Sequence, residues 1–353
     1  MSVRGENLSL VLHPSQKLTL EKTDIPEPKD TEVLIAIRCT GICASDIHMW
    51  AWGEVAKMKT VTPTVLGHES SGTVVKVGKS VKNFKTGDRV VIETSGPCLA
   101  CPLCLEGNYH LCPDLKRLGL CPYDGTFTRY IAHSAQFCYK LPDKLTFEEG
   151  ALVEPLAVGL HACRRGRVTG GDKVLICGAG AIGLLTMLTA RAFGATRICV
   201  TDVRNDRLEF AKKLGADCVV LADPDDDVCA RRVVESLGAN PDVSLDCCGF
   251  QATVTVALKA TKPRGVVVVV GIGPGDPKLP LAEAMLKEVD IVGVNRYPNC
   301  YQRAIDLLES GAVNGLPLIT HSFKLEEAVE AFEFVKREVP GTVKTMIRCQ
   351  PEY

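Results

Sequence analysis

The pattern of apolar and polar residues changes character near residue 150. Before that point, short β-branched runs bounded by glycine or by charged residues predict strands at 33–38, 72–78 and 87–93. No long helical pattern precedes about Phe147. The first 150 residues are therefore expected to form a β-rich domain.

After Phe147, strand patterns alternate with helical ones. Short apolar runs predict strands at residues 173–177, 198–201, 218–221, 243–246 and 266–271. Stretches of helical length predict helices between them, of which 181–193 and 206–214 are each followed by glycine. This alternation predicts a parallel, doubly wound α/β sheet. The last part of the chain mixes a helix at 301–310, a strand-like segment and a helix at 325–336.

The length and charge of the chain narrow the classes of protein it can belong to. Its 353 residues suffice for two domains of roughly 150 residues each. The 41 basic and 42 acidic residues leave a net charge of -1, which argues against a protein built to bind nucleic acid or an anionic membrane. No apolar run approaches the roughly 20 residues of a membrane-spanning helix, and the charged N-terminus does not resemble a signal peptide. A soluble, cytoplasmic protein is expected.

Cysteine is unusually abundant, with 17 residues. Most lie singly in apolar surroundings, which is typical of small core residues in a reducing compartment. Four of them, Cys98, Cys101, Cys104 and Cys112, fall within 15 residues, and their spacing can wrap four thiolates around one tetrahedral ion. An iron–sulfur site is an alternative for such spacing. The long gap before Cys112 and the absence of a second cluster motif favour zinc, and the near-neutral charge disfavours a zinc ribbon that binds nucleic acid.

A glycine-rich segment follows the first predicted strand of the parallel sheet. In Gly178-Ala-Gly180-Ala-Ile-Gly183 the first glycine permits a tight turn, the second lets the backbone approach a pyrophosphate, and the third lets helix and strand pack closely. The N-terminus of the following helix offers free N–H groups to phosphates. Asp202 ends the next strand 19 residues after Gly183, where a carboxylate that binds the ribose of NAD belongs. These features predict a dinucleotide site that prefers NAD, against which Arg204 weighs slightly because an arginine can bind a 2′-phosphate.

A second set of metal-type side chains lies in the β-rich part of the chain. Cys43 follows Gly41 and an isoleucine, and His68 and Glu69 follow Gly67. Together these three side chains could hold a zinc ion and leave one position for water or substrate, which is typical of a catalytic site. The ligand types alone do not distinguish such a site from unrelated structural residues.

Several motifs occur in the order found in the zinc-containing medium-chain dehydrogenase/reductase superfamily, which the chain resembles over nearly its whole length. They are Gly-Ile-Cys43, Gly67-His-Glu-x2-Gly72-x5-Gly78-x2-Val81, Gly87-Asp-Arg-Val, the four-cysteine lobe and Gly178-x-Gly-x2-Gly183. Within the superfamily the chain is most similar to the sorbitol dehydrogenase branch of polyol dehydrogenases. The residues that carry this closer similarity are Glu148-Glu-Gly-Ala-Leu-Val-Glu154-Pro-Leu-Ala-Val, Arg296-Tyr297 and Thr320-His-Ser-Phe.

The resemblance implies an α/β protein of two domains. A GroES-like, β-rich catalytic domain would comprise residues 1–155 and 295–353. A Rossmann domain, with a doubly wound parallel sheet that binds NAD, would comprise residues 156–294.

The resemblance also implies two zinc ions per chain, one structural and one catalytic. The four cysteines of the lobe would hold the structural ion. Cys43, His68 and Glu69 would hold the catalytic ion, with Glu154 bound to it directly or through water. Asp46 would orient His68, as metal-bound imidazoles usually require.

Further residue roles follow from the same resemblance. Ser45 and His48 would pass the substrate proton toward solvent, and Arg296 and Tyr297 would line the polyol pocket. The residues implied to contact the cofactor are Gly178, Gly180, Ala181, Ile182, Gly183, Asp202, Arg207, Val270, Gly271, Ile272, Val294, Asn295 and Arg296.

The chain departs from the pattern of the branch at two positions. An aromatic residue, often tyrosine, usually follows His48, but here Met49 and then Trp50 follow it. Because methionine cannot donate a hydrogen bond, we expect a less polar pocket near the far end of the substrate, with sorbitol not clearly preferred over five-carbon polyols. Ala181 stands where proline is common, and this position needs only helical geometry.

The function implied by the resemblance is NAD-dependent oxidation of a secondary hydroxyl of a sugar alcohol to a ketose. Candidate substrates are sorbitol, xylitol, L-arabinitol and galactitol, and a homotetramer is implied. One alternative is another secondary-alcohol dehydrogenase of the superfamily, such as a threonine dehydrogenase, over which Glu154 and Arg296-Tyr297 favour polyols. A catalytically silent zinc or nucleotide-binding protein is a second alternative, which the intact ligand set and Asp202 disfavour.

Overall fold

The computed structural model describes residues 6–55, 58–273, 275 and 277–351 of the chain. Its contacts divide the chain into two compact units. Unit 1 comprises Met1–Glu154, Tyr301–Gly311 and Gly315–Tyr353, and unit 2 comprises Pro155–Cys300 and Ala312–Asn314. We expected the chain to return to the first domain at residue 295, and by contacts it returns at Tyr301.

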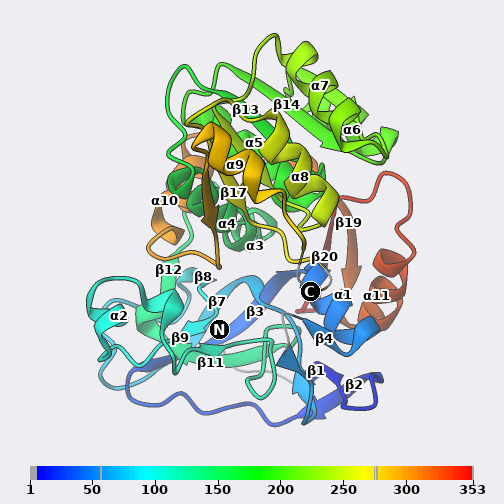
Figure 1. Ribbon diagram of the computed structural model, residues 1–353. Coiled ribbons are helices and arrows are strands. Elements are labelled where there is room, and N and C mark those ends of the chain that lie inside the picture. The colour runs from blue at the N-terminus through cyan, green and yellow to red at the C-terminus, as the bar shows by residue number, and fades with distance from the viewer. Residues whose placement is uncertain (1–5, 56–57, 274, 276, 352–353) are drawn as a thin grey trace. The chain divides into compact units, whose positions relative to one another are not determined.

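Unit 2 is built on a six-stranded parallel sheet with the strand order β15-β14-β13-β16-β17-β18. Strands β13, β14 and β17 of this sheet are labelled in Figure 1. The strands are β13 (Lys173–Cys177), β14 (Arg197–Asp202), β15 (Cys218–Leu221), β16 (Val243–Asp246), β17 (Val266–Val269) and β18 (Asp290–Gly293). The order reverses beside β13, as in a Rossmann sheet. The inner strands are continuous buried apolar runs because helices cover both faces of such a sheet. The predicted doubly wound parallel sheet is therefore confirmed.

Helices join the strands of unit 2. They are α4 (Val153–Arg165, which begins in unit 1), α5 (Ala181–Ala192), α6 (Asn205–Lys213), α7 (Asp226–Leu237), α8 (Gln251–Ala260) and α9 (Leu281–Lys287). Apolar side chains of α7, α8 and α9 pack with those of β13, β14 and β17 in one core. The sequence pattern did not predict β18 or α9, because β18 is largely exposed and carries no clear apolar period.

Unit 1 is mostly β-sheet. Its main sheet has the order β12-β8-β7-β3-β20-β19, and β11 also pairs with β3. These strands are β3 (Glu32–Gly41), β7 (Glu69–Val77), β8 (Arg89–Ile92), β11 (Tyr130–Ser134), β12 (Cys138–Lys140), β19 (Ile319–Lys324) and β20 (Lys344–Arg348). The smaller sheets comprise β1 (Asn7–Leu12), β2 (Leu18–Thr23), β4 (Glu54–Val55), β5 (Met58–Lys59), β6 (Thr64–Val65), β9 (Ser95–Gly96) and β10 (Lys116–Arg117). The predicted β-rich first domain is confirmed.

The helices of unit 1 are short, and the first three of them were not predicted. They are α1 (Ala44–Trp52), α2 (Pro102–Leu105), α3 (Phe147–Ala151), α10 (Tyr301–Glu309) and α11 (Ala328–Lys336), with 3-10 turns η1 (Tyr109–Leu111), η2 (Ala135–Phe137), η3 (Leu316–Leu318) and η4 (Leu325–Glu327). Helix α1 begins directly after Cys43, whose backbone N–H donates to Oδ2 of Asp46 at 3.0 Å. So short a helix depends on its cap and on tertiary packing more than on a periodic pattern.

Helix α1 packs one face into the core of unit 1. Met49 is 1% exposed and belongs to this core. The ring of Trp50 meets that of Phe332 edge-on at 6.0 Å, and Nζ of Lys336 lies 4.6 Å from the Trp50 ring. The side chain of Met49 thus lies on the buried face of α1. Its predicted place beside the substrate, and the preference for five-carbon polyols that depends on it, stay predictions.

Within the described ranges, no helix combines the length and the apolar character that crossing a bilayer requires.

Candidate active site

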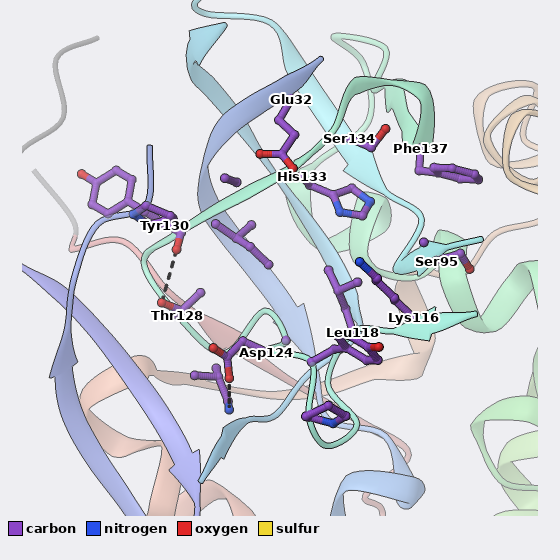
Figure 2. Close-up of a pocket in the computed structure, with 18 of the residues that line it drawn as sticks. Glu32, Ser95, Lys116, Leu118, Asp124, Thr128, Tyr130, His133, Ser134 and Phe137 are labelled. Carbon is purple, nitrogen blue, oxygen red and sulfur yellow. Dashed lines mark hydrogen bonds between the residues drawn. The ribbon is translucent and has the colours of Figure 1, made fainter. Parts of the chain in front are cut away.

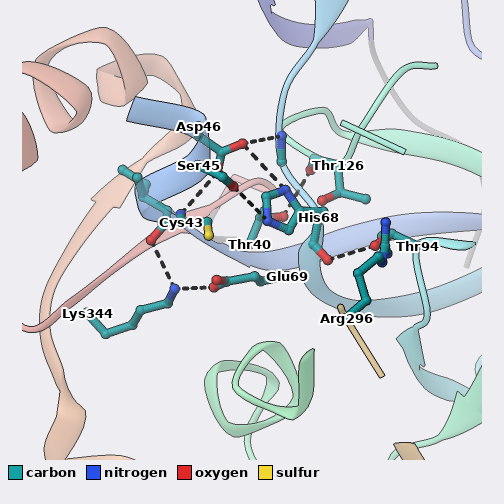
Figure 3. Close-up of polar contacts among 12 residues, drawn as sticks. Thr40, Cys43, Ser45, Asp46, His68, Glu69, Thr94, Thr126, Arg296 and Lys344 are labelled. Carbon is teal, nitrogen blue, oxygen red and sulfur yellow. Dashed lines mark hydrogen bonds and ion pairs between the residues drawn. The ribbon is translucent and has the colours of Figure 1, made fainter. Parts of the chain in front are cut away.

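Three metal-type side chains of unit 1 converge at one point of the main sheet (Figure 3). Cys43 precedes α1, and His68 and Glu69 lie where β7 begins. Strands β3 and β7 are paired so that Gly41 stands opposite Glu69, which brings the segment after β3 beside the start of β7. The ligand atoms of the three side chains lie within 4.8 Å of one another. The structure therefore brings together residues that the sequence separates by some 25 positions.

The carboxylate of Asp46 lies beside Nδ1 of the His68 imidazole. Its Oδ1 atom lies 3.5 Å from Nδ1 of His68, and the same oxygen accepts the backbone N–H of Gly67 at 3.4 Å. Burial disfavours the charged imidazole, but the negative charges of Asp46 and Cys43 outweigh this and raise the pKa of His68 well above its usual value. A carboxylate at Nδ1 leaves Nε2 as the nitrogen for a metal ion. The orienting role of Asp46 stays a prediction.

A buried ion pair holds the carboxylate of Glu69. Nζ of Lys344 contacts Oε2 of Glu69 and donates to the carbonyl of Ile42 at 3.0 Å, and the two charged side chains are 3% and 1% exposed. Burial lowers the pKa of Lys344, but the charges of Glu69, Cys43 and Glu154 outweigh burial and raise its pKa. Lys344 is thus a buried cation surrounded by the anionic groups of the predicted metal site.

Gly41 makes this ion pair possible. A Cβ at Gly41 would overlap the carboxylate of Glu69 and the side chain of Lys344. Glycine at this position is therefore a packing requirement. Lys344 was not predicted from the sequence. It lies in a late strand, far along the chain from the other site residues, and no local motif marks it.

The donor set fits zinc. A thiolate, an imidazole and a carboxylate are all zinc ligands, and three of them leave a fourth position open. Ligand atoms within 4.8 Å of one another can surround one ion at its usual distances of about 2.0–2.3 Å. Glu154 is buried and interacts electrostatically with Lys344, yet it is not part of the converging group in the described chain. Its contact with zinc stays a prediction.

Ser45 and His48 lie one turn apart on α1. Oγ of Ser45 is 3.4 Å from Nε2 of His68. The ring of His48 stacks on that of Trp52 at 3.9 Å between centroids, with an interplanar angle of 11°. Burial lowers the pKa of His48, which favours the neutral imidazole that a proton carrier needs. The relay through these two residues stays a prediction.

The four cysteines of the lobe also converge, around β9, α2 and η1. Sγ of Cys98 lies 3.9 Å from Sγ of Cys104, close to the roughly 3.8 Å expected between sulfurs held tetrahedrally at 2.3 Å from one zinc ion. The backbone N–H of Cys98 donates to Sγ of Cys112 at 3.4 Å, and that of Cys101 donates to Sγ of Cys98 at 3.3 Å. Backbone donors at Ala100 and Cys101 lower the pKa of Cys98 to about 7, which favours the thiolate. The geometry fits the structural zinc.

The glycine-rich turn of unit 2 links β13 to α5. Gly178 has a φ of 99°, a region that favours glycine, and a Cβ at Gly183 would overlap the carbonyl of Gly178. Asp202 ends β14 beside this turn, where its Oδ2 accepts the backbone N–H of Ala179 at 2.8 Å and its Oδ1 that of Arg204 at 2.9 Å. The structure thus brings the predicted ribose-binding carboxylate to the predicted pyrophosphate turn.

The two arginines after Asp202 differ in their partners. Arg204 makes a two-pronged contact with Asp206, from Nε at 3.0 Å and from Nη2 at 2.6 Å. Nη1 of Arg207 lies 4.0 Å from Oδ2 of Asp202. Because Asp206 already engages the guanidinium of Arg204, this arginine is less available to a 2′-phosphate than the sequence suggested.

The other predicted cofactor residues follow β17 and β18. The backbone N–H groups of Val270 and Gly271 both donate to the carbonyl of Asp246 at 2.9 Å, and Ile272 is largely exposed. The N–H of Val294 donates to the carbonyl at the end of β17 at 3.0 Å. The carboxyl ends of parallel strands share one edge of the sheet, so these segments lie at the same edge as the glycine turn. Their contact with a cofactor stays a prediction.

Arg296 and Tyr297 contact each other in unit 2. Nη2 of Arg296 donates to the hydroxyl of Tyr297 at 3.1 Å, and Tyr297 is 1% exposed. Arg296 has a φ of 53°, which is uncommon for a residue other than glycine and often marks a functional position. The predicted role of the pair in polyol binding stays a prediction.

A separate cavity of about 910 Å³ lies in unit 1 (Figure 2). It is bordered by residues of β1, β11 and the cysteine lobe, among them Ser95, Lys116, Asp124, Thr128 and His133. Within the described chain, none of the three converging metal-type residues lines it. The polar cluster, rather than this cavity, therefore marks the candidate active site.

Comparison with known proteins covers both units. The family model of the alcohol dehydrogenase GroES-like domain matches residues 29–143, and that of the zinc-binding dehydrogenases matches residues 181–310. Sorbitol dehydrogenase of Homo sapiens is 47% identical over 351 residues, which are 99% of this chain and 98% of that protein.

Solved structures give the same result. L-idonate 5-dehydrogenase of Escherichia coli has a TM-score of 0.90 at 30% identity, with 98% of each chain covered. An Escherichia coli protein described as a short chain alcohol dehydrogenase and crystallised with NADH has a TM-score of 0.90 at 25% identity, with 98% of this chain and 100% of that chain covered. The 47% identity to the human sorbitol dehydrogenase over almost the full length agrees with the motifs, the fold and the two metal-type clusters. The chain belongs to the zinc-containing medium-chain dehydrogenase/reductase superfamily, in its sorbitol dehydrogenase branch.

Proposed function

We propose that this chain is an NAD-dependent zinc polyol dehydrogenase, which oxidises a secondary hydroxyl of a sugar alcohol to the carbonyl of a ketose. The observation that carries the proposal is the convergence of Cys43, His68 and Glu69, whose ligand atoms lie within 4.8 Å of one another. Three such ligands would leave a fourth position of a zinc ion for the substrate. Zinc held there supplies a Lewis acid that polarises the hydroxyl oxygen of the substrate.

The surrounding residues of unit 1 position this site. Asp46 orients the imidazole of His68, and Lys344 fixes the carboxylate of Glu69. Ser45 and His48 accept the hydroxyl proton and pass it toward solvent, since Ser45 lies beside His68 and His48 is held neutral by burial. These side chains take part in proton transfer but not in hydride transfer.

The cofactor proposed is NAD. The N-terminus of α5 binds the pyrophosphate, and Asp202 binds the ribose hydroxyls and repels a 2′-phosphate. Two findings support this choice: Asp202 is fixed beside the glycine turn, and Asp206 engages the nearby Arg204.

The substrate proposed is a polyol, with sorbitol foremost and xylitol, L-arabinitol and galactitol as further candidates. The similar proteins named above are a sorbitol dehydrogenase and an L-idonate 5-dehydrogenase. Arg296 and Tyr297 are proposed to bind the polyol hydroxyls.

We also propose a homotetramer that acts in the cytoplasm. Strand β18 is an edge strand, and Ile291 on it is 39% exposed, while Leu281, Met285 and Leu286 on α9 are 61%, 70% and 78% exposed. Exposed apolar side chains beside an unpaired strand edge favour association with a second copy. All 17 cysteines are free, which suits a reducing compartment.

The experiment that tests the proposed function measures initial rates of NADH formation by zinc-loaded protein. The panel contains the four polyols, with L-threonine and a primary alcohol as controls. We expect NADH from several polyols, with sorbitol among the best, and little from the controls. A higher kcat/KM for L-threonine than for every polyol would contradict the proposal, and so would a preference for NADP.

A further inference from the structure

The parallel sheet of unit 2 places two cysteines beside each other on neighbouring strands. Cys199 of β14 and Cys218 of β15 are register partners, and both are free thiols. Neighbouring strands lie about 4.8 Å apart, and register partners point to the same face of a sheet. A disulfide needs Cα atoms roughly 4.4–6.8 Å apart. The backbone therefore already holds this pair at a distance that a disulfide can span.

The two thiols occupy unequal environments. Cys199 is fully buried in the core of unit 2, whereas Cys218 is half-buried and packs against the same core from its margin. A hydrogen bond from Cys199 and the charge of Arg197 lower the pKa of Cys218 although burial opposes this. The same contact, together with burial, raises the pKa of Cys199. Cys218 is thus the accessible thiol with thiolate character, and Cys199 is its protonated neighbour.

We propose that Cys199 and Cys218 form a reversible redox pair, in which a hydroperoxide oxidises Cys218 and Cys199 then closes a cross-strand disulfide. Low-pKa, accessible cysteines beside a second thiol are the sites where such oxidation occurs. In the described strand pairings, no other two cysteines are register partners. The pair lies in unit 2, and neither thiol belongs to either of the metal-type clusters.

The two steps balance with hydrogen peroxide as the oxidant. The thiolate of Cys218 attacks one peroxide oxygen, the O–O bond breaks, and hydroxide leaves and takes up the proton that the thiol had released. The thiol of Cys199 then attacks the sulfenic sulfur, an S–S bond forms, and the hydroxyl leaves with the Cys199 proton as a second water. Two thiols lose two electrons and the peroxide gains them.

Oxidation of Cys218 makes the following attack by the thiol of Cys199 easier. The negative charge of Cys218 contributes to the raised pKa of Cys199, and an uncharged sulfenic acid at Cys218 removes it. The disulfide would also be easy to reduce. Its Cβ atoms must approach to about 3.8 Å, closer than parallel strands stand, and strained disulfides are the labile ones. Strand β15 can move to allow this because, among the described strands, it lies at the edge of the sheet and pairs only with β14.

The test uses zinc-loaded full-length protein treated with a few equivalents of hydrogen peroxide. Remaining thiols are alkylated, and the digest is mapped by mass spectrometry. We expect a peptide that links Cys199 to Cys218, lighter than the two free peptides by two hydrogen masses and lost after treatment with dithiothreitol. The zinc content is measured in the same samples, so that oxidation of the four-cysteine lobe is detected separately.

Substitutions assign the roles of the two thiols. In Cys199→Val, a residue suited to a buried strand, Cys218 should accumulate as sulfenic or sulfinic acid, because the thiol that captures it is absent. In Cys218→Val, Cys199 should stay reduced. Cys229→Ala, on α7 in the same core, is the matched control and should form the disulfide as the unsubstituted protein does.

Three results would overturn the proposal. The first is full alkylation of both cysteines at peroxide levels that release zinc from the lobe. The second is a disulfide from Cys218 to Cys229 instead of Cys199. The third is an unchanged product at Cys218 when Cys199 is replaced by valine.

Discussion

Lys344 pairs with Glu69 inside unit 1, and its removal leaves a buried carboxylate without a counter-charge. We predict that Lys344→Met lowers the free energy of unfolding of the zinc-free protein by about 3–5 kcal/mol, which is typical of breaking a buried ion pair. The loss should be smaller in the zinc-loaded protein, because the metal then neutralises Glu69.

Urea unfolding of both forms measures this difference. Lys79→Met is the matched control, since Lys79 forms an exposed ion pair with Asp30, and such pairs contribute little. An equal loss with and without zinc would show that Lys344 is only a packing residue.

Asp202 is the residue proposed to favour NAD over NADP. We predict that Asp202→Ser lowers the ratio of kcat/KM for NAD to that for NADP by about tenfold or more, because a like charge no longer faces the 2′-phosphate. Asp202 also accepts the N–H of Ala179, so Asp202→Asn is the control that can keep a hydrogen bond while removing the charge. Initial rates with both cofactors measure the ratio. An unchanged ratio in both variants would remove Asp202 from cofactor selection.

Glu154 is predicted to act at the zinc site. Glu154→Gln should preserve the fold and NAD binding but reduce turnover by about 10–100-fold, the usual effect of a change beside a metal centre. Glu148→Gln is the matched control, because Glu148 is also an acid at a helix start but pairs with Arg348. Steady-state kcat and fluorescence titration with NADH check both effects. Full activity of the Glu154 variant would mean that this residue is structural.

Site residues that belong to a sequence motif could be predicted from the sequence. Residues that reach the site only through the folding of the chain could not. Cys43, His68 and Glu69 stand beside glycines in recognisable motifs, and they converge as expected. Lys344 was missed because it reaches the site from β20 without any local signal. The burial of Met49 was not predicted, because position in a motif does not reveal which face of a short helix is buried.

Strands and helices were predicted correctly where the local pattern of apolar residues is strong. Strands β13, β15 and β16 agree with the ranges expected from their apolar runs. Helix α1 was missed because its apolar side chains do not gather clearly on one helical face, and β18 because it is exposed. Local pattern is therefore informative for buried strands and weak for elements that depend on tertiary contacts.

The cysteine lobe is an element whose stability should depend on its metal. We predict two zinc ions per chain in the native protein. Cys101→Ser should release one of them and destabilise the lobe, while the catalytic site keeps the other, because the two sets of ligands are separate. Elemental analysis of both proteins measures the metal content. Iron, or a single zinc in fully loaded protein, would contradict the structural zinc.

The exposed apolar side chains of α9 are the surface on which the proposed tetramer depends. We predict that Leu286→Glu shifts the protein from the proposed tetramer to a smaller species, since a charge cannot be buried in an apolar interface without cost. Light scattering after size-exclusion chromatography measures the mass. Leu316→Glu is the control, as Leu316 is an exposed leucine of unit 1. A tetramer that persists in the Leu286 variant would exclude this face from the interface.

The division into two units could be predicted from the sequence, because the pattern changes near residue 150 from a β-rich one to alternating strands and helices. The return of the chain into unit 1 was less predictable. It falls at Tyr301, the first residue of α10, and contacts rather than pattern determine it.

Zinc-dependent oxidation of a polyol at the Cys43, His68 and Glu69 site is tested most directly by comparing the unsubstituted protein with His68→Ala. Both are reconstituted with zinc, and NADH absorbance is followed in the presence of NAD and sorbitol. We predict steady NADH formation by the unsubstituted protein with two zinc ions. The variant should retain one zinc ion and bind NADH normally but form no NADH. Turnover by the variant equal to that of the unsubstituted protein would contradict a catalytic zinc at this site, as would no NADH from any polyol with both zinc ions bound.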